Sequence, residues 1–337
     1  MYNFISTRMN DNKDQMLEAF RQLDASDPVS GDKLFEDFGP GSSDAATEPF
    51  ERYHDYELML LLLKQENADK YEQLHKGTPF FFLGWLAFQM RNYEAANFYL
   101  AAAIKEDQRK SNGQPFEVWI ENPAGKLVQL KQYGHPADIV VMVTRTFIQN
   151  ALVNFAVNTS SDLINTDVFV EKFVREFLKQ ENYALITALY SFVMEFEERY
   201  HYLHLTGANI ASVDPVIQHL FRGGRIFETI AKHYYPKKDS GGMIDNMGGL
   251  PMSREFRRDF PDVKQESMSV PVTSLEEIVA TSTNFDTATT FSNIAKIRNL
   301  SGHHMLSDEA AMIDIEGYKK LYEQEITAIL QLISKQW

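Results

Sequence analysis

The stretch that decides the fold is Phe80-Phe81-Phe82-Leu83-Gly84-Trp85-Leu86-Ala87, followed by Asn92-Tyr93-Glu94-Ala95-Ala96-Asn97-Phe98-Tyr99-Leu100-Ala101-Ala102-Ala103-Ile104. Both segments are rich in aromatic, leucine and alanine residues, and Asn92-Tyr93 lies at the turn between them. Gly84 and Ala95 are small residues at positions where two paired helices would approach each other. We therefore expect a helical hairpin over about residues 78–107.

This hairpin resembles one tetratricopeptide unit, a helix–turn–helix repeat. No clear second copy follows at the period of about 34 residues that this family has. An array usually needs at least about three repeats to be stable. The resemblance therefore implies one hairpin inside a larger helical domain, with a true repeat scaffold as the alternative.

Helical periodicity extends on both sides of the hairpin. We expect helices over residues 13–23, 50–74 and 136–158, and a further helix that carries Phe169, Phe173 and Phe177 at a spacing of four. Between residues 108 and 136 the pattern breaks, and Val118-Trp119-Ile120 and Leu127-Val128-Gln129-Leu130 flank Asn122-Pro123-Ala124-Gly125. This segment predicts a β-hairpin. Together, the hairpin and these flanking segments predict an N-terminal helical domain over residues 1–180.

The composition excludes several classes of function. The chain of 337 residues has no cysteine, so disulfides, thiolate metal sites and cysteine nucleophiles are absent. Its net charge is −14, which argues against a broad nucleic-acid-coating surface but leaves room for a small arginine-lined cleft. The N-terminus lacks the apolar core of a signal peptide, and no apolar run approaches the ~20 residues of a membrane span. We expect a cytoplasmic protein that does not enter the membrane.

A second domain is expected over residues 183–337. Its periodicity predicts four main helices, over residues 183–205, 214–234, 286–303 and 313–335. The long connection at about residues 236–285 is rich in glycine and proline. Its densest basic positions are Lys237, Lys238, Arg254, Arg257 and Arg258, so it could fold over a substrate or form a solvated, disordered excursion. The predicted class of the whole chain is all-α.

The motif with the clearest chemistry is Arg298-Asn299-Leu300-Ser301-Gly302-His303, near the end of the third of these helices. Asn299 and His303 are four residues apart, so they share a helix face. Arg298 lies about 100° around the helix, but its long guanidinium can reach the same place. A histidine can exchange protons near neutral pH, and an arginine can clamp two phosphate oxygens.

The spacing Arg-Asn-x-x-x-His resembles the signature of HEPN-domain ribonucleases, and its place on the penultimate helix of a helical bundle agrees with that family. The resemblance covers roughly residues 183–337. It implies a HEPN-like four-helix bundle that cleaves RNA without a metal or any other cofactor. The ribose 2′-hydroxyl would attack the adjacent phosphate, at a composite site formed by a homodimer. A toxin or antiviral-defence setting would follow from the family alone.

The same resemblance implies the roles of the catalytic residues. His303 would handle the proton of the 2′-hydroxyl or hold the hydroxyl in line. Arg298 would stabilise the charge that builds on the phosphate. Asn299 would orient His303 or the phosphate. The alternative is a non-catalytic adaptor, or a HEPN-like module that binds a nucleotide or a protein partner.

Other residues could complete this site. Arg222, Arg225 and His304 are candidate substrate-binding residues, and Glu228 could pair with one of the two arginines. Gly223-Gly224 within the second helix indicates a tight helix crossing or a kink. Gly302 could permit close packing or end the helix.

Three further predictions concern ligands. Glu197, His201 and His204 could share one helix face as metal ligands, but an ordinary helix end explains them better, so no metal is expected. RNA would bind in a local cleft. The N-terminal domain would take a protein partner or a signal ligand.

Overall fold

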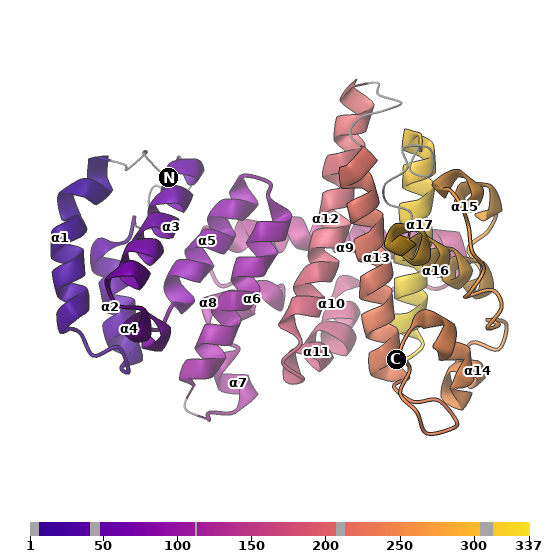
Figure 1. The fold of residues 1–337 in the computed structure, drawn as a ribbon, viewed down its shortest axis with the longest axis horizontal. Helices are drawn as coiled ribbons and strands as arrows, with labels where there is room; N and C mark the ends of the chain where they lie inside the picture. The colour runs from indigo at the N-terminus through magenta and orange to yellow at the C-terminus, as the bar shows by residue number, and fades with distance from the viewer. Residues whose placement is uncertain (1–6, 41–47, 112, 207–212, 304–312) are drawn as a thin grey trace. The chain divides into compact units, whose positions relative to one another are not determined.

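The structure is a computed structural model that describes residues 7–40, 48–111, 113–206, 213–303 and 313–337 (Figure 1). All regular elements in these ranges are helices, apart from an isolated antiparallel bridge between Lys237 and Met243. The predicted all-α class is therefore confirmed.

The chain folds into two compact units. The first unit consists of Met1–Thr144 and Phe177–Ala188, and the second consists of Arg145–Glu176 and Leu189–Trp337. Three helices run from one unit into the other: α9 (Asp138–Thr159), α11 (Arg175–Lys179) and α12 (Tyr183–Thr206). The predicted domain ranges of 1–180 and 183–337 stay a prediction.

The first unit contains the following helices in chain order: α1 (Thr7–Gln22), α2 (Pro28–Phe38), α3 (Pro49–Glu66), α4 (Ala68–Gln73), α5 (Gly77–Gln89), α6 (Tyr93–Lys110), α7 (Phe116–Trp119) and α8 (Pro123–Val128). Helices α5 and α6 form the predicted hairpin. The Asn92 side chain caps α6 by accepting a hydrogen bond from the Ala95 N–H at 3.1 Å.

Gly84 is required by the close packing of this hairpin. A Cβ atom on Gly84 would lie 2.9 Å from Cγ of Leu100 and 3.1 Å from the Ala96 carbonyl oxygen, both on α6. Ala96 is fully buried, whereas Ala95 is partly exposed. The small residue that faces Gly84 is therefore Ala96, and the prediction of Ala95 was wrong by one position.

The turn of the hairpin, followed by the same Asn-Tyr pair, occurs again in this unit. Arg91 and Glu181 both have positive φ, of 59° and 60°. The residues that follow, Asn92 and Asn182, donate backbone N–H groups to Ala87 and Phe177, each at 2.9 Å. The same Asn-Tyr pair thus follows the same left-handed turn before α6 and before α12.

The β-hairpin expected at residues 118–130 is wrong, because this segment forms α7 and α8. Pro123 occupies the first turn of α8, where its missing N–H costs nothing. The buried Gln129 side chain donates hydrogen bonds to the carbonyl oxygens of Ile120 (3.1 Å) and Gly125 (3.2 Å). Asn122-Pro123 therefore starts a helix and does not form a strand-connecting turn.

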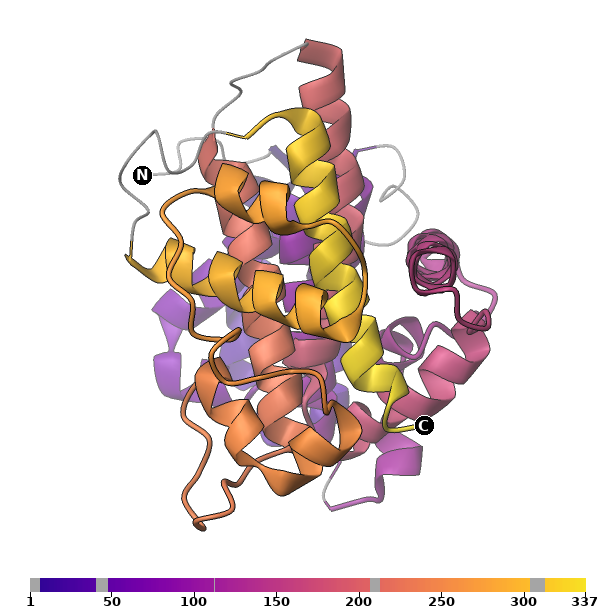
Figure 2. The same cartoon turned by 90° about the vertical axis from the view of Figure 1, so that its right-hand side faces the viewer.

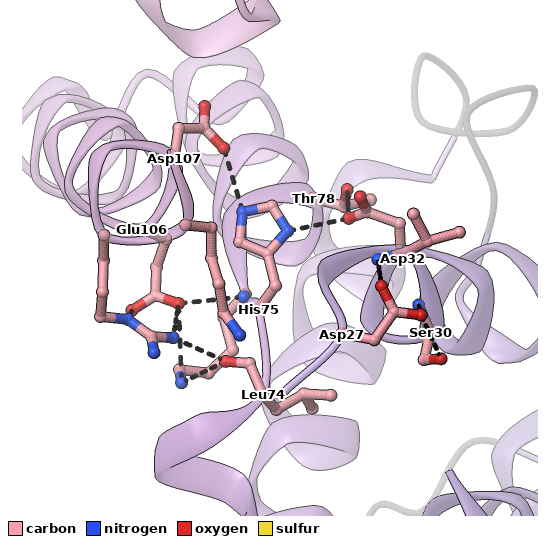
Figure 3. A network of polar contacts seen from close by, with 12 residues as sticks. Asp27, Ser30, Asp32, Leu74, His75, Thr78, Glu106 and Asp107 are labelled. Carbon is pink, nitrogen blue, oxygen red and sulfur yellow. Dashed lines mark hydrogen bonds and ion pairs between the residues drawn. The ribbon is translucent and has the colours of Figure 1, made fainter. Parts of the chain in front are cut away.

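A buried histidine connects three parts of the first unit (Figure 3). His75 Nδ1 lies 3.1 Å from the Asp32 carboxylate on α2, and Nε2 lies 3.1 Å from the Asp107 carboxylate on α6. Burial lowers the pKa of His75, but the hydrogen bonds to the two carboxylates outweigh it and raise the pKa to about 9. Burial raises the pKa of Asp107 as well, although the hydrogen bond to His75 lowers it. We regard His75 as the charged partner because two carboxylates share it.

This arrangement predicts a pH-dependent stability. The folded pKa of His75 lies above its unfolded value of 6.5, so its contribution is fully present below pH 6.5 and is lost as pH rises through about 9. We expect the free energy of unfolding to fall by up to about 3 kcal/mol over that range, and His75→Gln to remove the fall. Urea unfolding of the wild type and of His75→Gln at several pH values measures the free energy of unfolding, and an NMR titration of the imidazole measures the pKa of His75. An imidazole that titrates at or below 6.5 would contradict this assignment.

The second unit contains α13 (Val213–Tyr234), α16 (Thr287–His303) and α17 (Ile315–Ser334), which pack against one another. Figure 2 shows α16 lying across α13, with α17 beside both. The remaining elements wholly within this unit are α10 (Thr166–Phe169), η1 (Val170–Val174), η2 (Met247–Met252), α14 (Arg254–Asp259) and α15 (Leu275–Thr281).

The four helices predicted for the C-terminal part correspond to α12, α13, α16 and α17. The starts of α16 and α17 follow from side-chain caps. The Asp286 carboxylate accepts a hydrogen bond from the Thr289 N–H at 2.9 Å, and the Asp314 carboxylate accepts one from the Gly317 N–H at 2.6 Å.

The connection between α13 and α16 is not a solvated excursion, because it folds into η2, α14 and α15. It buries a row of apolar side chains: Ile244, Met247, Leu250, Phe256, Phe260, Val263, Met268, Leu275 and Ile278. Phe260 packs against Phe291 of α16 with ring centroids 4.9 Å apart. Arg257 pairs with Asp239, and Arg258 pairs with Asp259, so these basic groups have carboxylate partners within the connection.

Helix α9 is apolar enough for its composition to resemble a membrane span. Its most apolar 18-residue window has a mean hydropathy of 1.4, and 39 % of that window is buried. A core helix of a globular protein can meet the same criteria. The expectation that the protein does not enter a membrane stays a prediction.

Candidate functional site

The predicted catalytic residues all belong to the C-terminal half of α16. Arg298 and Asn299 are partly exposed, and the apolar Ile297 and Leu300 that flank them are buried. His303 is the last residue of α16, so Asn299 and His303 are one helical turn apart along the backbone. The side chain of His303 and all of His304 lie outside the described residues.

Arg298 is held by an acidic residue of the neighbouring helix. Its Nε donates a hydrogen bond to Oε2 of Glu228 on α13 at 3.0 Å. The other carboxylate oxygen of Glu228 lies 2.7 Å from the ammonium of Lys232, one turn further along α13. The Arg298 side chain is 33 % exposed and that of Glu228 is 10 % exposed. The pair therefore fixes the base of the guanidinium while part of the side chain reaches solvent.

Gly223 and Gly224 allow α13 to lie this close to α16 and α17. A Cβ atom on Gly224 would be 2.8 Å from Cβ of Arg298. A Cβ atom on Gly223 would be 2.5 Å from Oε2 of Glu325 on α17. Helix α13 is continuous through both residues. The predicted tight helix crossing is therefore confirmed. It brings α13 into contact with α16 at Arg298.

The two arginines expected to assist Arg298 have other surroundings. Arg222 pairs with Glu195 of α12 at 2.6 Å, and Glu195 also pairs with Arg199 at 2.7 Å. Arg225 is exposed, with its guanidinium 5.9 Å from the centre of the Phe221 ring. The expectation that Glu228 pairs with Arg222 or Arg225 was wrong, because Glu228 pairs with Arg298 and Lys232.

Glu228 as the partner of Arg298 is the residue that sequence reasoning missed. A usable signal was present, since Gly224 and Glu228 are four residues apart and share one face of α13. A face that brings Gly224 against Arg298 also brings Glu228 within reach of that guanidinium.

The interior of the second unit contains a second set of polar groups. The fully buried His219 ring lies with Nε2 2.7 Å from the Phe192 carbonyl oxygen and Nδ1 3.0 Å from the Tyr318 hydroxyl. Burial lowers the pKa of His219 well below its usual value, so the ring is neutral. The Nε2–H then donates to Phe192, and the Tyr318 hydroxyl donates to Nδ1. Both ring nitrogens of His219 are therefore satisfied inside the core, and the residue has a structural role.

Glu325 is a buried acid of a different kind. It is fully buried, and neither carboxyl oxygen has a side-chain hydrogen-bond partner among the described residues. Burial raises the pKa of Glu325 well above its usual value, only partly opposed by the backbone N–H of Gly224. The carboxyl group is therefore harder to ionise than an ordinary glutamate.

The possible metal ligands on α12 do not form a site within the described residues, where no cluster of three or more histidine and acidic side chains has a metal-binding arrangement. His204 stacks on Tyr200 with ring centroids 6.3 Å apart.

No protein-family profile, curated protein or solved structure matches the chain. What α13 and α16 bring together is a partly exposed guanidinium fixed by a carboxylate, on the same helix as Asn299 and His303. Such a group can bind a phosphate oxygen beside an imidazole.

Proposed function

We propose that the C-terminal part of the chain is a metal-independent endoribonuclease of the HEPN type that acts as a homodimer. The observation that carries this proposal is the position of Arg298. It lies five residues before His303 on α16, partly exposed, with its Nε fixed by Glu228. A fixed arginine suits a transition state in which charge builds on phosphate oxygens.

The reaction follows from the chemistry of the three motif residues. The ribose 2′-oxygen forms a bond to the adjacent phosphorus, and the bond from phosphorus to the 5′-oxygen breaks. His303 accepts the proton of the 2′-hydroxyl or aligns that hydroxyl, and the leaving 5′-oxygen takes up a proton. Arg298 binds a phosphate oxygen, and Asn299 orients His303 or the phosphate. The products carry a 2′,3′-cyclic phosphate and a 5′-hydroxyl.

Incubation of the purified protein with a mixed RNA pool in EDTA tests the proposal. We expect cleavage that leaves 2′,3′-cyclic phosphate ends, identified by their resistance to ligation until the cyclic phosphate is opened and the phosphate is removed. Products with 3′-hydroxyl ends, or cleavage that EDTA abolishes, would require a different mechanism.

A non-catalytic adaptor is the second candidate, and one observation favours it. Arg298 already forms an ion pair with Glu228 in a chain whose net charge is −14, so phosphate attraction is weak. On this view Arg298 is a structural ion pair between α13 and α16, and the helical surfaces bind protein.

Glu228→Gln separates the two candidates. If Glu228 positions Arg298, the loss of the charge-assisted hydrogen bond should lower kcat about tenfold with little change in KM. Steady-state cleavage of a labelled RNA measures both constants. Glu255→Gln is the matched control, because Glu255 is an exposed glutamate on α14 of the same unit. If the protein is instead a non-catalytic adaptor, neither the wild type nor Glu228→Gln should cleave the labelled RNA.

A further inference from the structure

The first unit has an open cavity of about 260 Å³ between α3, α4, α5 and α6. Its walls are largely apolar and include Leu58, Leu61, Phe80 and Leu83. Leu61 is 45 % exposed, so an apolar surface remains accessible at the opening. Small-molecule sites typically combine such walls with a few fixed polar groups.

The polar groups of this cavity are organised around Tyr99. Its hydroxyl donates a hydrogen bond to Oε1 of Glu57 at 3.3 Å, and both residues line the cavity. The Tyr99 ring lies 6.1 Å from the Phe80 ring and 6.0 Å from the Tyr53 ring, measured between centroids. Burial raises the pKa of Tyr99, and the carboxylate of Glu57 raises it further, so the hydroxyl stays a neutral donor. The Glu57 carboxylate is thereby fixed at an aromatic wall.

The charges at the cavity favour a cationic ligand. Lys64 and His54 also line it, but the Lys64 ammonium lies 3.5 Å from the carboxylate of Glu72, which is not part of the lining. Within the described part of the chain, Glu57 forms no ion pair with a cation. Glu57 is therefore a charged side chain of the cavity wall that has no ion-pair partner among the described residues. A carboxylate beside aromatic faces attracts an ammonium group by Coulomb and cation–π interactions together.

We propose that this cavity binds a small amphipathic cation, a primary amine on an apolar or aromatic body. The ammonium group contacts Glu57 and the face of Tyr99, and the apolar body lies between Leu58, Leu61 and Phe80. This ligand site belongs to the first unit, and it does not depend on the ribonuclease activity proposed above.

Calorimetric titration of the full-length protein with three probes of similar shape tests the site. The probes are 2-phenylethylamine as the cation, 2-phenylethanol as the neutral analogue and 3-phenylpropionate as the anion, at pH 8. We expect saturable binding of the amine with a Kd on the order of 1 mM or below. The neutral and anionic probes should bind at least tenfold more weakly.

Three variants connect the binding to the cavity. Glu57→Gln should weaken binding of the amine at least tenfold, whereas Glu51→Gln, at an exposed position on the same helix, should leave it unchanged. Leu61→Trp should fill the cavity and abolish binding; because Leu61 is partly exposed, the core need not repack. Circular dichroism and the thermal midpoint verify folding of each variant. Equal binding of the three probes, no binding by the folded wild type, or an unaffected Glu57→Gln would each overturn the proposal.

Discussion

His303→Ala is expected to lower the rate of RNA cleavage by about 10²- to 10⁴-fold, the usual contribution of a general acid or base. Arg298→Ala should cost about 10²- to 10³-fold, because it removes the group that stabilises charge on the phosphate. The two losses should not add in the double variant if both residues act in one transition state. Single-turnover cleavage of a labelled RNA in EDTA measures these rates.

Two controls make the result specific to the motif. His201→Ala replaces an exposed histidine of α12 and should retain full activity. His304→Ala replaces the neighbouring histidine, for which we expect only a substrate-binding role and therefore a change mainly in KM. Full activity in His303→Ala, with the oligomeric state unchanged, would remove the motif from the mechanism. A loss in His201→Ala as large as that in His303→Ala would indicate general damage to the bundle.

The helical class and the main helices of the C-terminal part were predictable because their signals are local. Apolar residues recur every three or four positions, and Asp286 and Asp314 cap α16 and α17 within a few residues of the predicted starts. The hairpin of α5 and α6 was predictable for the same reason. Its exact packing was not, since whether Ala95 or Ala96 faces Gly84 depends on the rotation of α6.

The errors come from segments whose structure depends on distant partners. Asn122-Pro123 fits both a turn and a helix start, and the buried Gln129 side chain that stabilises the helical form lies outside that motif. The connection after α13 appears polar and glycine-rich along the sequence. Two of its apolar residues, Phe256 and Phe260, nevertheless pack against Phe291 of α16.

The candidate site shows the same division between local and distant signals. The spacing of Arg298, Asn299 and His303 is visible in the sequence. The pairing of Arg298 with Glu228 spans 70 residues and depends on the glycines that bring α13 and α16 together. Only the packed helices identify which of several glutamates holds the arginine.

Glu325→Gln is expected to make the second unit more stable than the wild type at neutral and alkaline pH. The folded pKa of Glu325 is raised by burial, so above pH 4.5 the unfolded chain binds fewer protons at this site than the folded chain does. Each pH unit then costs up to about 1.4 kcal/mol of folding free energy, until the pH reaches the folded pKa. Glutamine keeps the shape of the side chain but cannot ionise, so the variant should lose this dependence.

Urea unfolding between pH 5 and pH 6.5 is the decisive measurement, because His75 does not yet contribute a pH dependence there. The wild type should lose stability across that interval, while Glu325→Gln should lose clearly less. Glu276→Gln, at an exposed position on α15, should follow the wild type. Parallel curves for the wild type and Glu325→Gln would mean that Glu325 has a charge-stabilising partner in the folded protein. If the curves diverge, the space beside Gly223 holds a protonated acid, since a Cβ atom there would lie 2.5 Å from Glu325 Oε2. The close approach of α13 to α17 would then depend on that proton, because ionisation would place an unpaired charge at the crossing.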